Sequence, residues 1–273
     1  MNYKQIFSII GIVSLLLLPV NCRNINADLI SSDRQNIITE KNKDGDTLAV
    51  DKMILINNTW NKQNITDYKQ SIYIKKSNGK KTFGWSWEWP NSGWSVKSYP
   101  EITCGDKPWD RPLNLRSDFP IKVSAARISA EYKIKTASSG TNNLAFEMWI
   151  TDKIPGTPES ITHEIMIWID NKGMSGAGKH VSDLTVNNTE FDFYLRKSHG
   201  DASGKSTVQW TYAAFIARQS KFEGPLDFTP FIKFLIEQKI LNPDLYIANI
   251  ELGNEIVNGK GYTEVSDYRI IVK

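Results

Sequence analysis

The sequence predicts an all-β protein built as a sandwich or jelly roll, and three observations carry this prediction. About a dozen short runs alternate in polarity or are rich in β-branched residues, and turn-forming residues separate them. Only one segment has helical spacing, which argues against a parallel α/β sheet. The length of 273 residues suits one large β domain, and we find no internal repeat and no second domain.

The first 22 residues are expected to be an export signal. Lys4 supplies a positive charge, and residues 6–20 are apolar apart from two serines. This stretch is shorter than the roughly 20 residues that span a membrane. Cleavage near residue 27 would release a soluble protein, whereas cleavage before Cys22 would leave that cysteine as a lipid-bearing N-terminus. We therefore expect a secreted, periplasmic or cell-surface protein.

The remaining chain divides into a polar tether and one folded domain. Residues 23–46 are rich in Asn, Ser, Asp and Lys and lack periodicity, so we expect the domain to cover 47–273. The strands predicted there are 53–56, 73–76, 83–89, 94–99, 121–135, 144–151, 164–169, 190–197, 208–216, 245–252 and 268–272.

The one predicted helix follows Thr229, a good N-cap residue with Pro230 at the first helical position. Asn242-Pro243 ends the segment. Phe231, Phe234 and Leu235 form an apolar stripe, which we expect to dock on the back of a sheet.

Composition excludes several classes of function. The net charge is +3 and the basic residues are scattered, so no electrostatic footprint for nucleic acid is present. No glycine fingerprint for phosphate occurs, and three dispersed histidines and two cysteines lack metal-site spacing. We expect no metal and no organic cofactor. Nothing implies a protein partner, so a monomer is expected.

The segment around Glu164 has two unlike faces if it is a strand. Ile165, Ile167 and Ile169 form an aliphatic face that suits a sheet core, whereas Glu164, Met166 and Trp168 form the other face. A carboxylate beside a large aromatic fits a ligand cleft better than a core or a solvent face. The alternative is a partly exposed strand glutamate with a salt-bridge partner.

A second group of carboxylates lies near the C-terminus. Alternation puts Glu251 and Glu255 on one face, and Glu255 precedes the Gly-rich segment 258–261, which reads as a turn. Hydrolysis of a glycosidic bond needs two carboxyl groups, one to protonate the leaving oxygen and one to attack or to activate water. Glu164 and Glu255 are the candidates, and Glu251 is the rival of Glu255.

Aromatic residues beside amides point to a sugar ligand. Trp60 follows Asn57 and Asn58, and indole rings stack on glucose units while amides bond their hydroxyls. Alternation puts Trp85, Trp87 and Trp89 on one face, and we expect at least one of these three to be core structure.

At these residues the chain resembles glycoside hydrolase family 12, the small retaining endo-β-1,4-glucanases and xyloglucanases. The resemblance spans roughly Asp51 to the C-terminus. The matched blocks are Asn57–Trp60, Trp87–Trp89, Val96–Tyr99, Asn143–Glu147, Glu164–Trp168 and Gly253–Glu255.

The resemblance implies a jelly roll of two curved antiparallel sheets, with a concave substrate cleft and one helix packed behind. It implies Glu164 as nucleophile and Glu255 as general acid/base. Glu147 takes the position of a family Asp that contacts the nucleophile. The substrate-binding residues that we expect are Asn58, Trp60, Asn143, Met166 and Trp89.

The predicted function is a secreted, endo-acting β-1,4-glucan hydrolase for cellulose, mixed-linkage β-glucan or xyloglucan. The alternative is a non-catalytic carbohydrate-binding sandwich that holds glucan without cutting it, because the same aromatic residues would serve both functions. The sequence does not discriminate between the glucans.

Overall fold

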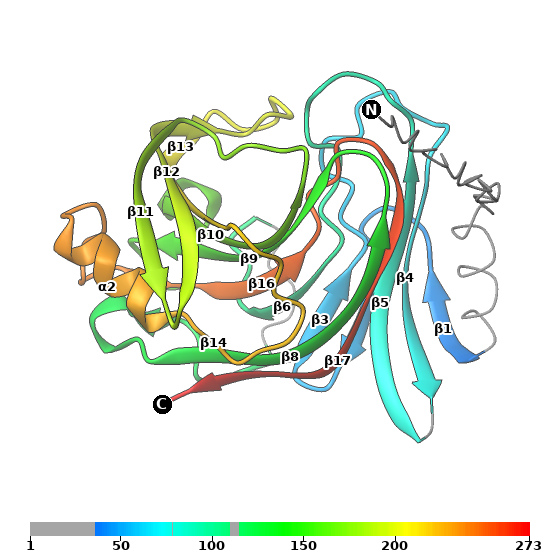
Figure 1. Ribbon diagram of the computed structural model, residues 1–273, viewed down its shortest axis with the longest axis horizontal. Coiled ribbons are helices and arrows are strands. Elements are labelled where there is room, and N and C mark those ends of the chain that lie inside the picture. The colour runs from blue at the N-terminus through cyan, green and yellow to red at the C-terminus, as the bar shows by residue number, and fades with distance from the viewer. Residues whose placement is uncertain (1–35, 78, 110–114) are drawn as a thin grey trace, which may run out of the picture. The chain divides into compact units, whose positions relative to one another are not determined.

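The computed structural model describes residues 36–77, 79–109 and 115–273, which form two β-sheets and the helix α2 (Figure 1). The predicted export signal, the anchor at Cys22 and residues 23–35 of the predicted tether lie outside the described residues. Within the described part of the chain, no helix has the length and apolar character that crossing a membrane requires.

The first sheet has six strands. Their order is β1 (Ile37–Lys41), β4 (Lys69–Ser77), β5 (Lys80–Trp89), β17 (Gly259–Val272), β8 (Ile128–Ser138) and β14 (Leu226–Asp227). Every neighbouring pair in this sheet is antiparallel. The long strands β5, β8 and β17 curve strongly, which lets the sheet wrap the core (Figure 1).

The second sheet has eleven strands and carries the candidate catalytic residues. Nine of them run in the order β11 (Lys179–Val186), β12 (Thr189–Gly200), β13 (Gln209–Ala217), β10 (Ile161–Lys172), β9 (Asn142–Thr151), β16 (Asn249–Gly253), β6 (Glu101–Gly105), β3 (Met53–Ile56) and β2 (Thr47–Val50). The short strand β15 (Tyr246–Ile247) pairs with β9 and with β7 (Ile121–Lys122). The pair β10–β13 is parallel, so this sheet is mixed and not purely antiparallel as expected.

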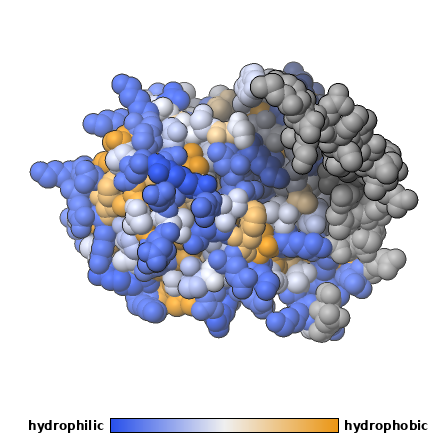
Figure 2. Space-filling view, in the orientation of Figure 1, coloured by the Kyte–Doolittle hydropathy of each residue, from blue (hydrophilic) through white to orange (hydrophobic). Residues whose placement is uncertain are grey.

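The main core lies between the two sheets. One buried cluster contains Trp85, Trp87 and Trp89 of β5 together with the isoleucines of β10. All three indoles are at most 3% exposed. The expectation that at least one of them is core structure is confirmed, and it holds for the whole run. Figure 2 shows the outer surface of the molecule, where hydrophilic residues cover most of the visible face and hydrophobic ones form small separate groups.

The helix α2 (Thr229–Glu237) packs on the core side of β12 and β13. Phe231 meets the rings of Phe191 and Phe215, and Phe234 meets those of Phe193 and Phe215. The predicted docking of the stripe is therefore confirmed. The predicted N-cap is wrong by one residue, because the N-cap is Phe228 and Thr229 is already helical. The Thr229 N–H donates to the carboxylate of Asp227 at 2.9 Å.

Several predicted boundaries are wrong. The predicted strand 121–135 is divided into β7 and β8, and the predicted strand 245–252 into β15 and β16. The tether predicted to reach residue 46 contains β1, which pairs with β4 through backbone hydrogen bonds that polarity alternation did not reveal. Residues 94–97 are a loop, and only Ser98 bridges to Ile256. The Gly-rich segment opens β17, because a Cβ at Gly259 would lie 2.1 Å from the Ser139 carbonyl oxygen and strand pairing there requires glycine.

Cys104 is a free, buried thiol on β6. Burial raises its pKa to about 11, so it stays protonated and behaves as a small apolar core residue.

Candidate active site

Strand β10 has the two faces that alternation predicted. Ile165, Ile167 and Ile169 belong to the core between the sheets. Met166 and Trp168 belong to a second cluster on the opposite face, together with Tyr212 of β13. We call this opposite face of the eleven-stranded sheet the site face. The site face carries Glu164, and only 7% of this residue is exposed.

Glu164 is held by residues of β13 and β12. The indole N–H of Trp210 donates to Glu164 Oε2 at 2.6 Å, and His199 Nε2 lies 4.0 Å from the same oxygen. Burial and then the negative charge of Glu255 raise the pKa of Glu164, and the Trp210 hydrogen bond lowers it. Burial lowers the pKa of His199 to about 4, so this ring is neutral at neutral pH.

Glu255 lies just beyond the end of β16 and is clamped by Asn143 of β9. The backbone N–H of Glu255 donates to Asn143 Oδ1 at 2.9 Å, and the Asn143 side-chain amide donates to Glu255 Oε2. Burial raises the pKa of Glu255, and the Asn143 hydrogen bond opposes this rise. The side chain is nevertheless only half-buried, so a ligand can reach it.

The two carboxyl groups titrate as a pair. Both pKa values lie above the ordinary range of a glutamate, and the charge of Glu255 raises the pKa of Glu164. After burial, the charges of Glu255 and Glu164 also raise the pKa of Tyr212 of β13. Such a pair is suited to acid–base and nucleophilic chemistry.

Two further glutamates lie on the neighbouring strands. Glu147 of β9 is opposite Met166 of β10 and opposite Glu251 of β16. Glu251 is fully buried and accepts hydrogen bonds from Asn249 at 2.6 Å and from Lys107 at 3.1 Å. Because Glu251 has no exposed surface, it is a poorer candidate for proton donation to a polymer than Glu255.

Residues 51–273 match the model of glycosyl hydrolase family 12. The chain belongs to this family. It is therefore a glycoside hydrolase with the jelly-roll fold of the family.

Relatives and solved structures agree with this assignment. Endoglucanase S of Pectobacterium parmentieri is 28% identical over 226 residues, which cover 81% of this chain and 82% of that protein. A probable xyloglucan-specific endo-β-1,4-glucanase A of Aspergillus clavatus is 26% identical over 242 residues, covering 85% and 91%. The fold matches that of the family 12 xyloglucanase from Bacillus licheniformis with a TM-score of 0.77 at 24% identity, covering 86% of this chain and all of that one.

The structure separates the residues expected to bind glucan into two groups. Asn58 and Trp60 are half-buried, and Asn58 donates to Glu101 Oε1 at 3.2 Å while the Trp60 carbonyl accepts from Lys205 at 2.9 Å. Asn143 is fully buried, and its amide is engaged with Glu255, so it positions a carboxyl group. Met166 is 1% exposed, and its sulfur accepts the indole N–H of Trp168 at 3.4 Å.

The expectation for Trp89 is wrong. Its indole N–H donates to Gln70 at 2.9 Å, its ring stacks on Tyr68 with centroids 4.1 Å apart, and only 3% of the residue is exposed. The reason is its parity on β5, which points Trp89 to the same side as Trp85 and Trp87, into the core.

Sequence reasoning missed several residues of the site. Trp210 and Tyr212 lie in the predicted strand 208–216, and His199 lies two residues beyond the predicted strand 190–197. Their proximity to Glu164 depends on the parallel pairing of β10 with β13. The available signal was that Trp210 and Tyr212 alternate on one face of the predicted strand 208–216. The buried Lys107 and Glu101 were also missed.

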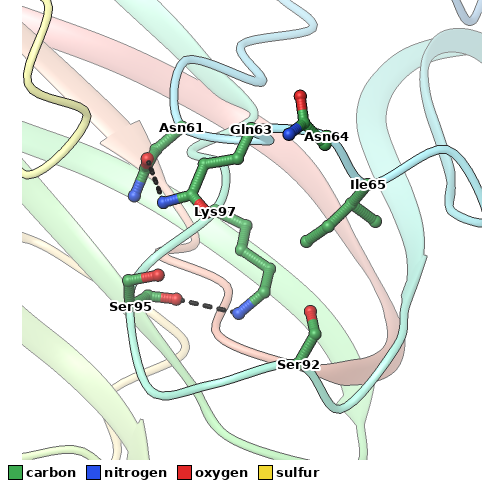
Figure 3. Close-up of a pocket in the computed structure, with 7 residues that line it drawn as sticks. All are labelled: Asn61, Gln63, Asn64, Ile65, Ser92, Ser95 and Lys97. Carbon is green, nitrogen blue, oxygen red and sulfur yellow. Dashed lines mark hydrogen bonds between the residues drawn. The ribbon is translucent and has the colours of Figure 1, made fainter.

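A polar pocket of about 250 Å³ lies beside the turn that carries Trp60 (Figure 3). It is lined by Asn61, Gln63, Asn64, Ile65, Ser92, Ser95 and Lys97. The Lys97 backbone connects it to the region of Glu255, because the Lys97 N–H donates to the Ile256 carbonyl at 2.8 Å. The lining offers amides and hydroxyls, which suit sugar hydroxyl groups.

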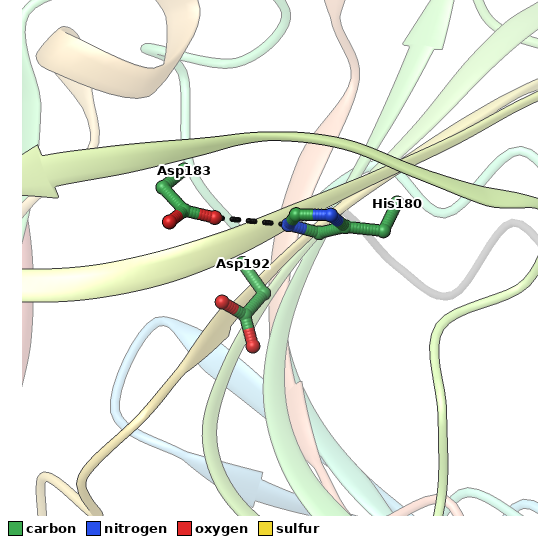
Figure 4. Close-up of side chains that lie close together, drawn as sticks. All are labelled: His180, Asp183 and Asp192. Atoms are coloured by element: carbon green, nitrogen blue, oxygen red, sulfur yellow. Dashed lines mark hydrogen bonds and ion pairs between the residues drawn. The ribbon is translucent and has the colours of Figure 1, made fainter.

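A separate cluster on β11 and β12 brings together His180, Asp183 and Asp192 (Figure 4). The guanidinium of Arg218 lies 2.6 Å from Asp183 and 2.7 Å from Asp192, and His180 Nε2 lies 2.9 Å from Asp183. Both carboxylates therefore already have a cationic partner, Arg218. We interpret the cluster as a solvated network of ion pairs and not as a metal site.

Proposed function

We propose that the protein is an endo-acting β-1,4-glucan hydrolase that works by double displacement with retention, with Glu164 as nucleophile and Glu255 as general acid/base. The observation that carries this proposal is the pair of coupled carboxyl groups, 91 positions apart in sequence and each held by its own N–H donor. Two such groups are what retaining glycoside hydrolysis requires.

In the first step, Glu255 donates its proton to the glycosidic oxygen as the bond from that oxygen to the anomeric carbon breaks. Glu164, ionised, forms a bond to the anomeric carbon and gives a glycosyl-enzyme. In the second step, Glu255 takes a proton from water, the water oxygen attacks the anomeric carbon, and Glu164 leaves. The one-proton state of the pair is the state that this sequence needs.

The substrate class rests on the family and on the names of the relatives. The relatives are named as an endoglucanase and as xyloglucan-specific endo-β-1,4-glucanases. Half-buried Trp60, with Asn58 two residues earlier, offers an aromatic platform and an amide for a glucan chain. The polar pocket next to this turn offers room for a sugar that branches from the glucan backbone. We therefore include the branched glucan xyloglucan among the substrates to be tested.

Release of reducing ends from carboxymethyl-cellulose, mixed-linkage β-glucan and xyloglucan tests the activity. Proton NMR of the first products then distinguishes retention from inversion at the anomeric carbon. An inverted product would refute the double displacement while leaving the glucanase function. Binding of glucan without any release of reducing ends would favour the non-catalytic alternative.

We also propose that the chain acts outside the cytoplasm, on the basis of the charged and apolar pattern of residues 1–22. The mass of the mature protein tests this. Cleavage near residue 27 leaves an unmodified polypeptide, whereas a lipid-bearing Cys22 adds the mass of its acyl chains. A full-length cytoplasmic product would contradict the proposal.

A further inference from the structure

Lys107 is a buried lysine at the edge of the site face. Its side chain is 5% exposed, and its ammonium lies 2.6 Å from Glu101 Oε1 and 3.1 Å from Glu251 Oε2. Lys107 follows β6 in the chain, and its side chain folds back over Glu101, the first residue of that strand. A buried ammonium is tolerated only when it is paired in this way.

The partners of Lys107 are part of a row of carboxyl groups. Four adjacent strands, in the order β6, β16, β9 and β10, each carry one buried glutamate. The members of this carboxylate row are Glu101, Glu251, Glu147 and Glu164. Glu251 is directly opposite Glu147, and Glu147 is opposite the residue two positions after Glu164. Lys107 therefore lies at one end of the row and the proposed nucleophile at the other.

Like charges in a buried row destabilise one another, and a single ammonium offsets part of this repulsion. Burial and then Glu251 raise the pKa of Glu147, and Lys107 lowers it. Glu251 also raises the pKa of Glu164. The titratable groups that face the row from the packed strands are Glu255, His199, Tyr99 and Tyr212. His199 is neutral, so Lys107 is the cation within the described residues that the row contacts.

We propose that Lys107 is a positioning residue for catalysis: it fixes Glu251 beside Glu147 and offsets the negative charge of the row, and it thereby sets the acidic limit of activity at Glu164. The proposal rests on the proposed role of Glu164 as nucleophile.

Three variants test the charge effect on the pH profile of kcat/KM, which reports ionisation in the free enzyme. Lys107→Met removes a positive charge and should move the acidic limb up by about one pH unit. Glu251→Gln removes a negative charge and should move it down by about the same amount. The double variant removes the ion pair as a unit, and its acidic limb should return to within a few tenths of a unit of the wild type.

Lys75→Met is the matched control. Lys75 forms a similarly buried pair with Glu264, but on the six-stranded sheet. Both lysine variants should lower thermal stability, because each loses a buried ion pair. Lys75→Met should leave the acidic limb unchanged, so the control separates the loss of an ion pair from the proposed charge effect.

An unchanged acidic limb in both single variants, or shifts of the same sign, would overturn the proposal. If Lys107→Met fails to fold, the double variant is compared with Glu251→Gln, because these two differ only at position 107. The acidic limb of the double variant must then lie at higher pH than that of Glu251→Gln. Absence of glucan hydrolysis by the wild type would refute the proposed function instead, so the two failures are distinguishable.

Discussion

The two faces of strand β10 use burial in opposite ways. On the core face, Ile165, Ile167 and Ile169 are 0% exposed and gain stability from the apolar surface that they remove from water. On the site face, Glu164 is almost as buried, and burial there raises the pKa of a carboxyl group instead. The same strand therefore stabilises the fold with the residues of one face, and the other face holds the proposed nucleophile in a setting that raises its pKa.

The largest effect that would sharpen this comparison is expected for Glu164→Gln. The amide is nearly isosteric but cannot attack the anomeric carbon, so kcat/KM should fall by at least about 10³-fold. Thermal unfolding should stay close to that of the wild type, because an uncharged group at a buried position carries no desolvation cost of ionisation. Retention of more than a few per cent of activity would remove Glu164 from the role of nucleophile.

Ile167→Ala should show the reverse pattern. Loss of a fully buried branched side chain from the core should lower the free energy of unfolding by about 2–5 kcal/mol. In conditions where the variant is folded, kcat/KM should remain within about threefold of the wild type. Urea unfolding and steady-state kinetics measure the two quantities. A large loss of activity in fully folded protein would show that the two faces are not independent.

Asn143→Ala should act on the acid/base. The Asn143 amide lowers the pKa of Glu255, so its removal should raise that pKa. Activity needs protonated Glu255, which is present below its pKa and lost above it; the basic limb of the pH profile should therefore move to higher pH. We expect kcat to fall about 10- to 100-fold from lost positioning. Asn171→Ala, at the exposed end of β10, removes an amide that donates to the Met174 carbonyl and is the control. A basic limb that stays in place would contradict the assignment of that limb to Glu255.

Trp210→Phe should give the smallest change. It removes the N–H that donates to Glu164 Oε2 at 2.6 Å, and this hydrogen bond lowers the pKa of Glu164. The acidic limb should therefore move to higher pH, and kcat/KM should fall about tenfold, the scale of one hydrogen bond to a charged group.

Trp149→Phe is the matched control for this change. Trp149 packs 5.4 Å from Trp210, centroid to centroid, and its buried N–H makes no hydrogen bond within the described residues. Equal shifts of the acidic limb in both variants would show that aromatic packing, and not the hydrogen bond, controls Glu164.

Local patterns predicted the parts of this protein that depend on residue parity. Alternation separated the two faces of β10 and put the three tryptophans of β5 on one side. It did not say which side of β5 faces the core, and the family resemblance did not prevent the wrong expectation for Trp89. The strand β1 was missed because its burial pattern shows no apolar face, and its pairing with β4 holds it in place.

The sequence by itself determined the fold class, the helix α2 and the glutamates to examine, because the periods of a strand and of a helix are local properties. Only the tertiary structure decided which strands are neighbours. The parallel pairing of β10 with β13 brings Trp210 to Glu164, and the order β6–β16–β9–β10 aligns four glutamates with Lys107 at one end. These contacts join residues far apart in the chain, and the pKa values of the site depend on them.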